Sequence, residues 1–271
     1  MKQKKIIFND SEIVRFCRAT IDTNEIHDPK FMEKRGKRAI VPGMFVLAQT
    51  VNLSGDFLKN HAKSIRVLFN SLLSAGDFVT LCTFSDKNDP SEIRLSALNC
   101  KDIMNSKGEY SRLSVEEFDF KTVPSGILRK LEVKPEQVRQ FIQLIGSDDK
   151  DVANFLFAIA YASQALLRSI DKPETMIEKE ICETITKDPG ISPFYRNLEI
   201  HIPTPFPVFD PIGELDYFIH FECEKPHKLY GAYVRCESDG DLIFQAYYEL
   251  AGISDLLILR MASEIKHHQP V

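Results

Sequence analysis

The stretch ATIDTNEIHDP, residues 19–29, places three polar side chains close together: Asp22, Asn24 and His27. A carboxylate and an imidazole can exchange protons, and an amide can hold a reactant or a water molecule in place. The stretch has neither a helical nor a strand period, and it lies between an apolar entry and a proline exit. It is therefore either a catalytic segment or an ordinary solvated loop.

The elements around this stretch occur twice in the same order. A helix is expected near residues 11–19, an apolar helix from about Pro42, and then strands with period-2 alternation; a second helix, apolar helix and set of strands follow after about residue 134. Anchor residues lie at similar intervals in the two halves: Phe16 to Phe141 is 125 residues, Gly76 to Gly213 is 137, and Gly108 to Gly240 is 132.

The two apolar helices break this interval, because Phe45 and Phe157 are only 112 residues apart. The shortfall lies where the second half runs from Gly146 through SDDKD directly into its helix. The segment that corresponds to residues 20–42 is thus missing from the second half. A segment that only one half has is unlikely to be required by the fold, and this favours a functional role for it.

An apolar helix followed by antiparallel strands predicts an α+β fold in which a sheet wraps around a central helix. The charged and proline-containing stretch EEFDFKTVPSGILRKLEVKPE is expected to connect the two copies. We place the boundary near Pro124, which gives a repeat of residues 1–124 and a degenerate repeat of residues 125–271.

Composition excludes several classes of protein. A formal charge of −5 on 271 residues argues against general nucleic-acid binding. The six cysteines show neither CxxC pairs nor histidines at metal spacing, so no zinc site or redox dithiol is expected, and reduced thiols fit a cytoplasmic protein. Neither a signal peptide nor a membrane span is indicated, because the most apolar stretch, which begins at Val152, is too short to cross a bilayer.

The spacing D-x-N-x-x-H, followed by a P-G-M that opens an apolar helix and by the A-G-D turn of SLLSAGDFV, resembles the MaoC-like hot-dog dehydratases, which include the R-specific enoyl-CoA hydratases. The resemblance covers the first ~120 residues, and the second half resembles a degenerate repeat, so a double hot-dog chain is expected. The chain departs from the family pattern at Glu25 and at Pro42.

The resemblance implies reversible hydration of trans-2-enoyl thioesters to (R)-3-hydroxyacyl thioesters of coenzyme A or acyl carrier protein, without a metal or other cofactor. Asp22 and His27 would be the catalytic pair that acts on water. Asn24 would orient the water or the pair. The backbone N–H of Gly43, at the start of the central helix, would bind the thioester oxygen as negative charge develops on it.

Each residue also has a structural interpretation. His27 would be an ordinary loop histidine, Asp22 and Asn24 would make Asx turns, and Gly43 would allow close packing. The basic run KRGKR, Lys34 to Arg38, would meet coenzyme A phosphates or an acidic carrier protein, although a solvated loop is the more frequent case. The pair His267 and His268 in the polar C-terminal tail is expected to have no role.

The second half has no histidine before its apolar helix, and its SDDK segment offers acids without a partner base, so it is expected to be non-catalytic. It would complete the sheet and shape a tunnel for the acyl chain, with Phe155, Phe157 and Tyr161 as lining candidates or simple core residues. Two other activities stay open: an acyl thioesterase on the same fold, and a non-catalytic acyl-thioester binding protein. A homodimer is also compatible with the sequence.

Overall fold

The computed structural model describes residues 2–69, 72–85, 91–99, 109–115, 126–171, 173–187, 191–225 and 229–262. The boundary expected near Pro124, the anchor Gly108 and the pair His267 and His268 lie outside these residues. Within them, no helix is both long and apolar enough to cross a membrane.

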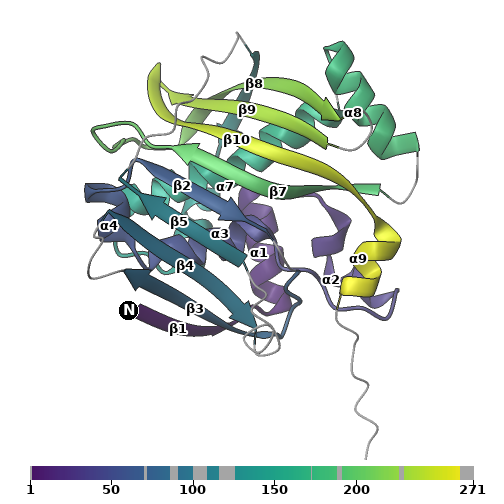
Figure 1. Ribbon diagram of the computed structural model, residues 1–271, viewed down its shortest axis with the longest axis horizontal. Helices are drawn as coiled ribbons and strands as arrows, with labels where there is room; N and C mark the ends of the chain where they lie inside the picture. Colours follow the sequence, from purple (N-terminus) through teal and green to yellow (C-terminus); the bar gives the residue numbers. More distant parts are fainter. Residues whose placement is uncertain are drawn as a thin grey trace, which may run out of the picture.

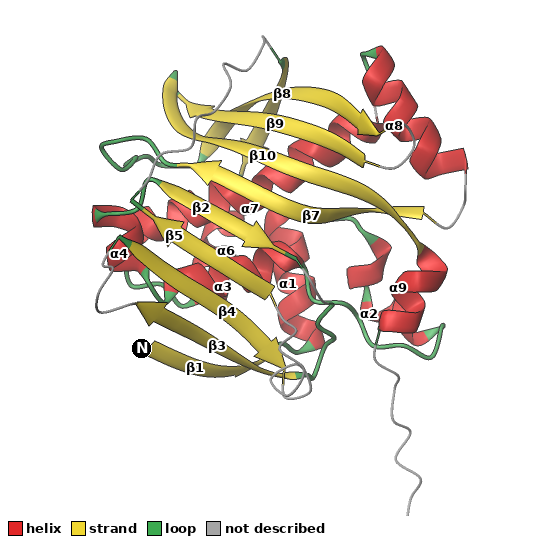
Figure 2. Ribbon diagram, viewed as in Figure 1, coloured by secondary structure: helices red, strands yellow, loops and turns green. Residues whose placement is uncertain are grey.

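One antiparallel sheet forms a layer. The central helices pack behind it, and α8 and α9 lie at its side (Figures 1 and 2). The helices are α1 (Asp10–Thr20), the 3-10 turn η1 (Glu25–His27), α2 (Pro29–Glu33), α3 (Gly43–Asn52), α4 (Gly55–Asn60), α6 (Pro135–Ile145), α7 (Lys150–Asp171), α8 (Met176–Lys187) and α9 (Asp255–Met261). The strands of the first half are β1 (Lys2–Ile7), β2 (Ser64–Leu68), β3 (Phe78–Ser85), β4 (Glu92–Asn99) and β5 (Glu109–Ser114). Those of the second half are β6 (Ile127–Val133), β7 (Ile191–His201), β8 (Gly213–Lys225), β9 (Leu229–Ser238) and β10 (Asp241–Ser254).

The ten strands lie in the order β1-β3-β4-β5-β2-β7-β10-β9-β8-β6. This order is symmetric about the central antiparallel pair β2 and β7, because each strand of one side has a counterpart at the same place on the other side. The predicted α+β class, with a sheet wrapped around apolar helices, is confirmed. We propose from the symmetric order that the chain consists of two repeats that meet between β5 and β6.

Part of the expected connector is a strand. We interpreted residues 116–136 as linking chain, but Ile127–Val133 form β6 and pair with β8 at the sheet edge. Lys130 and Glu132 are exposed and alternate with Leu131 and Val133, which are buried. That period of two is typical of a strand with one solvated face. The many charged residues favoured the interpretation as linking chain.

Helices α1 and α6 are equivalent elements of the two halves. Their first residues, Asp10 and Pro135, are 125 residues apart. So are Ile21 and Gly146, which end the two helices in the left-handed conformation. Each helix has a capping box at its N-terminus, in which the third helical residue, Glu12 or Gln137, bonds back to the cap backbone. The polar segment that begins at Asp22 therefore starts at a well-defined helix end.

The core is continuous across the halves through a line of aromatic rings. Phe16 of α1 stacks on Phe45 of α3 with ring centroids 4.6 Å apart, and Phe141 of α6 meets Phe157 of α7 edge-on at 5.4 Å. Phe16 and Phe141 join the two pairs at 5.8 Å. All four side chains are buried, so the helices of both halves share one interior.

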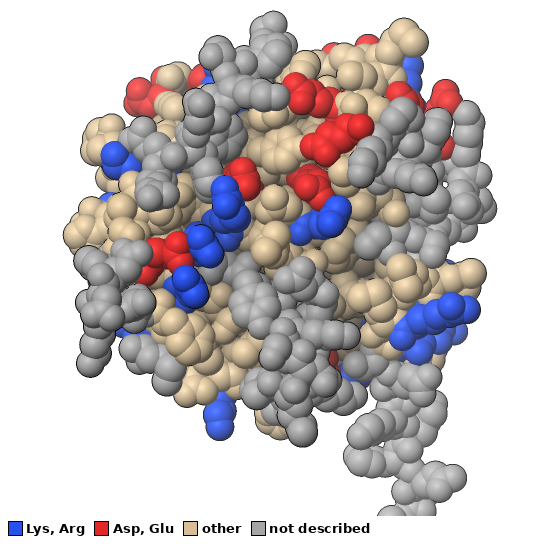
Figure 3. Space-filling view, in the orientation of Figure 1, with Lys and Arg blue, Asp and Glu red and all other residues tan. Residues whose placement is uncertain are grey.

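The outer face of the sheet carries charges of both signs (Figure 3). Arg66 on β2 pairs with Glu199 on β7 across the centre of the sheet at 2.9 Å, and Arg112 on β5 pairs with Glu92 on β4 at 3.1 Å. Alternate residues of the same strands, such as Ile65 and Leu113, are buried against the helices. The functional cavity is accordingly expected on the helical side.

Replacing Phe16 with alanine tests the shared core. A buried Phe→Ala change costs about 3–5 kcal/mol, because it removes apolar burial and leaves a cavity, and Phe16 is 1% exposed. We expect the free energy of unfolding, measured by urea denaturation, to fall by that amount in a single transition. The matched control is Phe78→Ala, since Phe78 is 65% exposed and a surface change stays within about 0.5 kcal/mol. Two separate transitions would contradict the shared interior.

Candidate active site

Asp22 is held at the end of α1. The helix stops where Ile21 takes a left-handed conformation with φ of 53°, and the Asp22 N–H then donates to the Cys17 carbonyl at 2.8 Å. One carboxylate oxygen, Oδ1, accepts the N–H of Asn24 at 3.0 Å. This Asx turn fixes the carboxylate and leaves Oδ2 for another partner.

Asn24 starts the turn that carries His27. Its Oδ1 accepts the Ile26 N–H at 3.3 Å and caps η1. The Asx turn that was the structural interpretation of Asn24 is therefore present. The side-chain amide nitrogen of Asn24 makes no hydrogen bond among the described residues. Asn24 also lines the cavity described below. The segment expected to be an irregular loop contains this turn and the short helix α2, which Asp28 caps through the Lys30 N–H at 2.9 Å.

The ring orientation of His27 is set by Ile40. His27 Nδ1 lies 2.7 Å from the Ile40 carbonyl oxygen. A carbonyl can only accept, so Nδ1 carries the proton and Nε2 of the neutral ring is an acceptor. Ile40 is itself fixed, because its N–H donates to Ile26 at 2.9 Å and it bridges to Ser74.

His27 Nε2 and Asp22 Oδ2 face each other at 3.7 Å. Both side chains are largely buried, with exposed fractions of 11% for His27 and 13% for Asp22. The gap is too long for a direct hydrogen bond, and both atoms are acceptors when the imidazole is neutral. One water molecule, with its two O–H groups, can satisfy both acceptors at once.

Gly43 begins α3 on another wall of the same site. Pro42 precedes it without a side-chain cap, and the first backbone donors to Pro42 are Phe45 and Val46. The Gly43 N–H makes no hydrogen bond among the described residues. The approach to Pro42 is held in place by pairing of residues 39–41 with residues 73–75, including Val41 N–H to Leu73 at 2.8 Å. A free helix N-terminal donor therefore has a fixed position.

A narrow, mainly apolar cavity joins these groups. Its volume is about 80 Å³. The four residues predicted as the site, Asp22, Asn24, His27 and Gly43, all line it. The other lining residues are Ile26, Ile40, Val41, Pro42, Met44, Val46, Phe69, Leu72, Leu73, Ser163, Leu166, Phe194, Tyr195 and Leu250.

Asp22, Asn24 and His27 also line a wider depression on the outer side of the same segment. Its other walls come from α1 and α2, and they include Cys17 and Arg18. Burial raises the pKa of the Cys17 thiol, and the Asp22 carboxylate raises it further. Asp22, Asn24 and His27 therefore lie between an apolar cavity and a wider, open depression.

Five cavity residues that the sequence did not single out come from the second half: Ser163 and Leu166 of α7, Phe194 and Tyr195 of β7, and Leu250 of β10. Of the two interpretations of Phe155, Phe157 and Tyr161, the structure supports simple core residues and not tunnel lining, since these rings are fully buried and none borders the cavity. They come before Ser163 and Leu166, the two residues at which α7 meets the cavity. Helical periodicity alone could not show which turn reaches the site.

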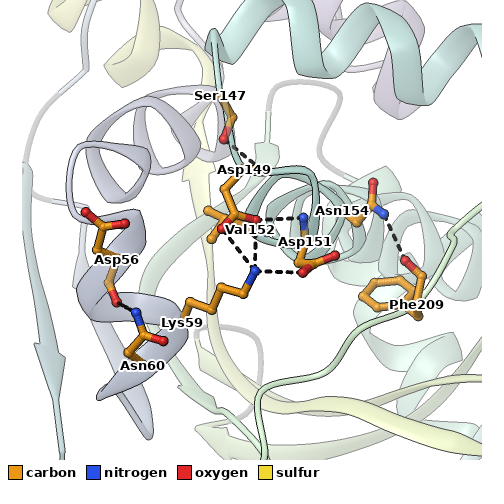
Figure 4. Close-up of polar contacts among 9 residues, drawn as sticks. All are labelled: Asp56, Lys59, Asn60, Ser147, Asp149, Asp151, Val152, Asn154 and Phe209. Atoms are coloured by element: carbon orange, nitrogen blue, oxygen red, sulfur yellow. Dashed lines mark hydrogen bonds and ion pairs between the residues drawn. The ribbon is translucent and has the colours of Figure 1, made fainter.

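The acids of the second half have structural partners. Asp149 Oδ1 accepts the N–H groups of Asp151 and Val152 at the start of α7, at 2.9 and 3.1 Å. Lys59 of α4 reaches both carboxylates, at 3.1 Å for Asp149 and 2.7 Å for Asp151 (Figure 4). These acids cap a helix and fasten it to the first half, which agrees with the absence of a partner base noted in the sequence.

The basic run from Lys34 to Arg38 is partly used within the protein. Arg38 donates to the Ala75 carbonyl at 2.6 Å and pairs with Asp77 at 2.5 Å, in the turn that contains Gly76. Arg35 lies over the Phe31 ring, with 3.6 Å from its guanidinium carbon to the ring centroid. Arg38 thus ties the basic run to the turn at Gly76, and Arg35 packs within its own segment. In the part of the chain described, no group of three or more His, Cys, Asp or Glu side chains is placed to hold a metal ion.

Comparison with solved structures identifies the fold as a double hot-dog. A MaoC-like dehydratase from Phytophthora capsici superimposes with a TM-score of 0.55 at 10% identity, over 94% of this chain and 95% of that chain. Another MaoC-like dehydratase gives 0.54 at 10% identity, over 92% and 97% of the two chains. A Mycobacterium tuberculosis protein with a double hot-dog fold gives 0.51 at 11% identity, over 92% and 94%. No protein-family model and no curated protein sequence matches the chain.

The hydrogen bond between His27 and Ile40 predicts a single imidazole tautomer. At a pH where the ring is neutral, we expect ¹⁵N NMR to show a protonated Nδ1 and an unprotonated Nε2 for His27, because the carbonyl 2.7 Å from Nδ1 needs a donor. His61 is the control, since it lies exposed after α4 and has no such bond. A His27 spectrum with protonated Nε2 would contradict the orientation described.

Proposed function

We propose that this chain is a hydro-lyase that reversibly hydrates trans-2-enoyl thioesters to (R)-3-hydroxyacyl thioesters. The observation that carries the proposal is the 3.7 Å gap between His27 Nε2 and Asp22 Oδ2, which opens into an apolar cavity that Gly43 also lines. The double hot-dog fold, which the chain shares with MaoC-like dehydratases, supports the same reaction class.

Water is activated in the gap between the two side chains. Its O–H groups donate to Asp22 Oδ2 and His27 Nε2, so a lone pair of the oxygen stays available to attack the third carbon of the enoyl group. One proton passes from water to the pair as the new C–O bond forms, and a proton from the pair is delivered to the second carbon. The side chains end in their starting state, and the overall reaction adds one water molecule.

The Gly43 N–H serves the other end of the reacting group. Attack at the third carbon pushes electrons onto the thioester oxygen, which becomes enolate-like. A backbone donor at a helix N-terminus is oriented in advance and is favoured by the helix dipole, so it stabilises this charge by about 3 kcal/mol. The donor of Gly43 has no competing partner in the described chain.

The cavity and the outer depression divide the substrate between them. The apolar walls contributed by Phe69, Leu166 and Phe194 suit the acyl chain. The depression on the other side of Asp22 and His27 leads to solvent and accommodates the carrier arm of coenzyme A or of acyl carrier protein. The thioester then lies beside the reactive pair.

Substitution of the reactive pair tests the chemistry. Asp22→Asn and His27→Ala are each expected to lower the turnover of crotonyl-CoA by at least about 100-fold, because acid–base catalysis supplies about 10²–10⁴ in rate. Loss of enoyl absorbance measures hydration, and a thiol reagent measures hydrolysis in the same samples.

Asp56→Asn and His61→Ala are matched controls, since they have the same residue types and spacing on and after α4, outside the cavity. Near wild-type hydration by either test variant would refute the catalytic assignment. Thiol release in place of hydration would identify a thioesterase, and ligand-induced thermal stabilisation without either reaction would identify a binding protein.

Replacing Gly43 with proline removes the single N–H that the proposal uses. Gly43 is the first residue of α3, where proline fits a helix, and Pro42 has ψ of 129°, which suits a residue that precedes proline. We expect Gly43→Pro to fold and to lose about 10²–10³ in kcat. Gly43→Ala is the control because it keeps the N–H, and it should be far more active. Equal activities of the two variants would exclude this donor.

A further inference from the structure

Tyr195 brings a second kind of polar group into the cavity. Apart from the segment that carries Asp22 and His27, the polar side chains on the cavity wall are those of Ser163 and Tyr195. The Ser163 hydroxyl already donates to the Ala160 carbonyl at 2.7 Å. The Tyr195 hydroxyl makes no hydrogen bond within the described chain. It is therefore a donor on the cavity wall that still lacks an acceptor.

A β-bulge turns Tyr195 inward. Glu249 of β10 faces Asn197, and the next residue, Leu250, faces Tyr195, so Arg196 has no opposite residue. In a regular strand the side chain of Arg196 would share the inward face with Leu198. Instead, Arg196 is 67% exposed and pairs with Glu249 at 3.2 Å. The extra residue shifts the alternation and sends Tyr195 into the interior, as bulges near functional sites do.

The ring of Tyr195 is held between two other rings. Its centroid lies 5.5 Å from that of Tyr248 and 6.5 Å from that of Phe69. Burial raises the pKa of Tyr195, and the negative charge of Asp22 raises it further. The hydroxyl consequently stays protonated and acts as a donor close to Asp22.

The substrate oxygen nearest to Asp22 is the one on the third carbon. Under the proposed function, this oxygen is the attacking water in one direction and the 3-hydroxyl in the other, and it lies between Asp22 and His27. The thioester oxygen is served by Gly43, on a different wall. A ligand that supplies an oxygen at this place gives the Tyr195 hydroxyl the acceptor that it lacks within the described chain, so such a ligand is favoured over one that does not.

We propose that the Tyr195 hydroxyl donates a hydrogen bond to the oxygen on the third carbon of the acyl group, and that it makes the cavity selective for (R)-3-hydroxyacyl thioesters over saturated ones. The inference rests on the proposed function for the identity of the ligand. It assigns to the second half of the chain a direct contact with the reacting group.

Binding without turnover tests this role. In a His27→Ala background, calorimetry compares (R)-3-hydroxybutyryl-CoA with butyryl-CoA, which differ by one hydroxyl. We expect tighter binding of the hydroxylated ligand. Adding Tyr195→Phe should lower this preference, the ratio of the two dissociation constants, by about 3–10-fold, because one neutral hydrogen bond is lost. Tyr248→Phe is the matched control: the Tyr248 hydroxyl also lacks a partner in the described chain, but Tyr248 is fully buried and does not line the cavity. Adding Tyr248→Phe should leave the preference for the hydroxylated ligand unchanged.

Three results would overturn the inference: no preference for the hydroxylated ligand in the His27→Ala protein, an unchanged preference after Tyr195→Phe, or an equal loss with Tyr248→Phe. The first of these needs no change at Tyr195, so the test holds even if Tyr195→Phe fails to fold. Because no turnover is measured, an inactive wild-type chain that keeps a Tyr195-dependent preference would refute the hydro-lyase proposal and leave this one standing.

Discussion

The antiparallel pairing of β2 with β7 is the interaction on which the site depends. Its register, from Ser64 opposite His201 to Leu68 opposite Asn197, joins two five-stranded halves into one sheet. Just beyond it, the Phe69 N–H donates to the Arg196 carbonyl at 3.2 Å, which sets Phe69 beside the bulge that carries Tyr195. One wall of the cavity therefore belongs to each half, and neither half alone encloses it.

The two central helices explain why the candidate site lies in the first half of a symmetric fold. The ring contacts of Phe45 and Phe157 make α3 and α7 equivalent, and at that interval Gly43 corresponds to Phe155. Helix α7 has already begun at Lys150, so the backbone N–H of Phe155 lies inside a helix, whereas that of Gly43 is at a helix start. The shorter α3 leaves room that the segment with Asp22 and His27 occupies. The free donor and the reactive pair thus arise from the same difference in helix length.

The sequence predicted those parts of the site that depend on local signals. Asp22, Asn24 and His27 lie on one short segment, and the Pro-Gly before an apolar run marks a helix start. Their juxtaposition with Gly43 was implied by the resemblance to the MaoC-like dehydratases, and all four residues line the cavity. Tyr195 and Leu250 could not be found in this way, because a strand register and a one-residue bulge bring them to the cavity. Neither the register nor the bulge can be predicted from side-chain periodicity, and a bulge interrupts the alternation by which a strand is recognised.

The position of Asp22 also depends on backbone strain that the core compensates. Ile21 is a β-branched residue at φ of 53°, where Gly146, its equivalent in the second half, has φ of 63°. A side chain in this region costs about 1–2 kcal/mol, which glycine avoids. The Ile21 side chain packs against the main core, and that burial offsets the cost. The half with the reactive pair thus ends its helix with a residue that the interior holds in place, so the core, and not the loop itself, fixes the direction in which Asp22 leaves α1.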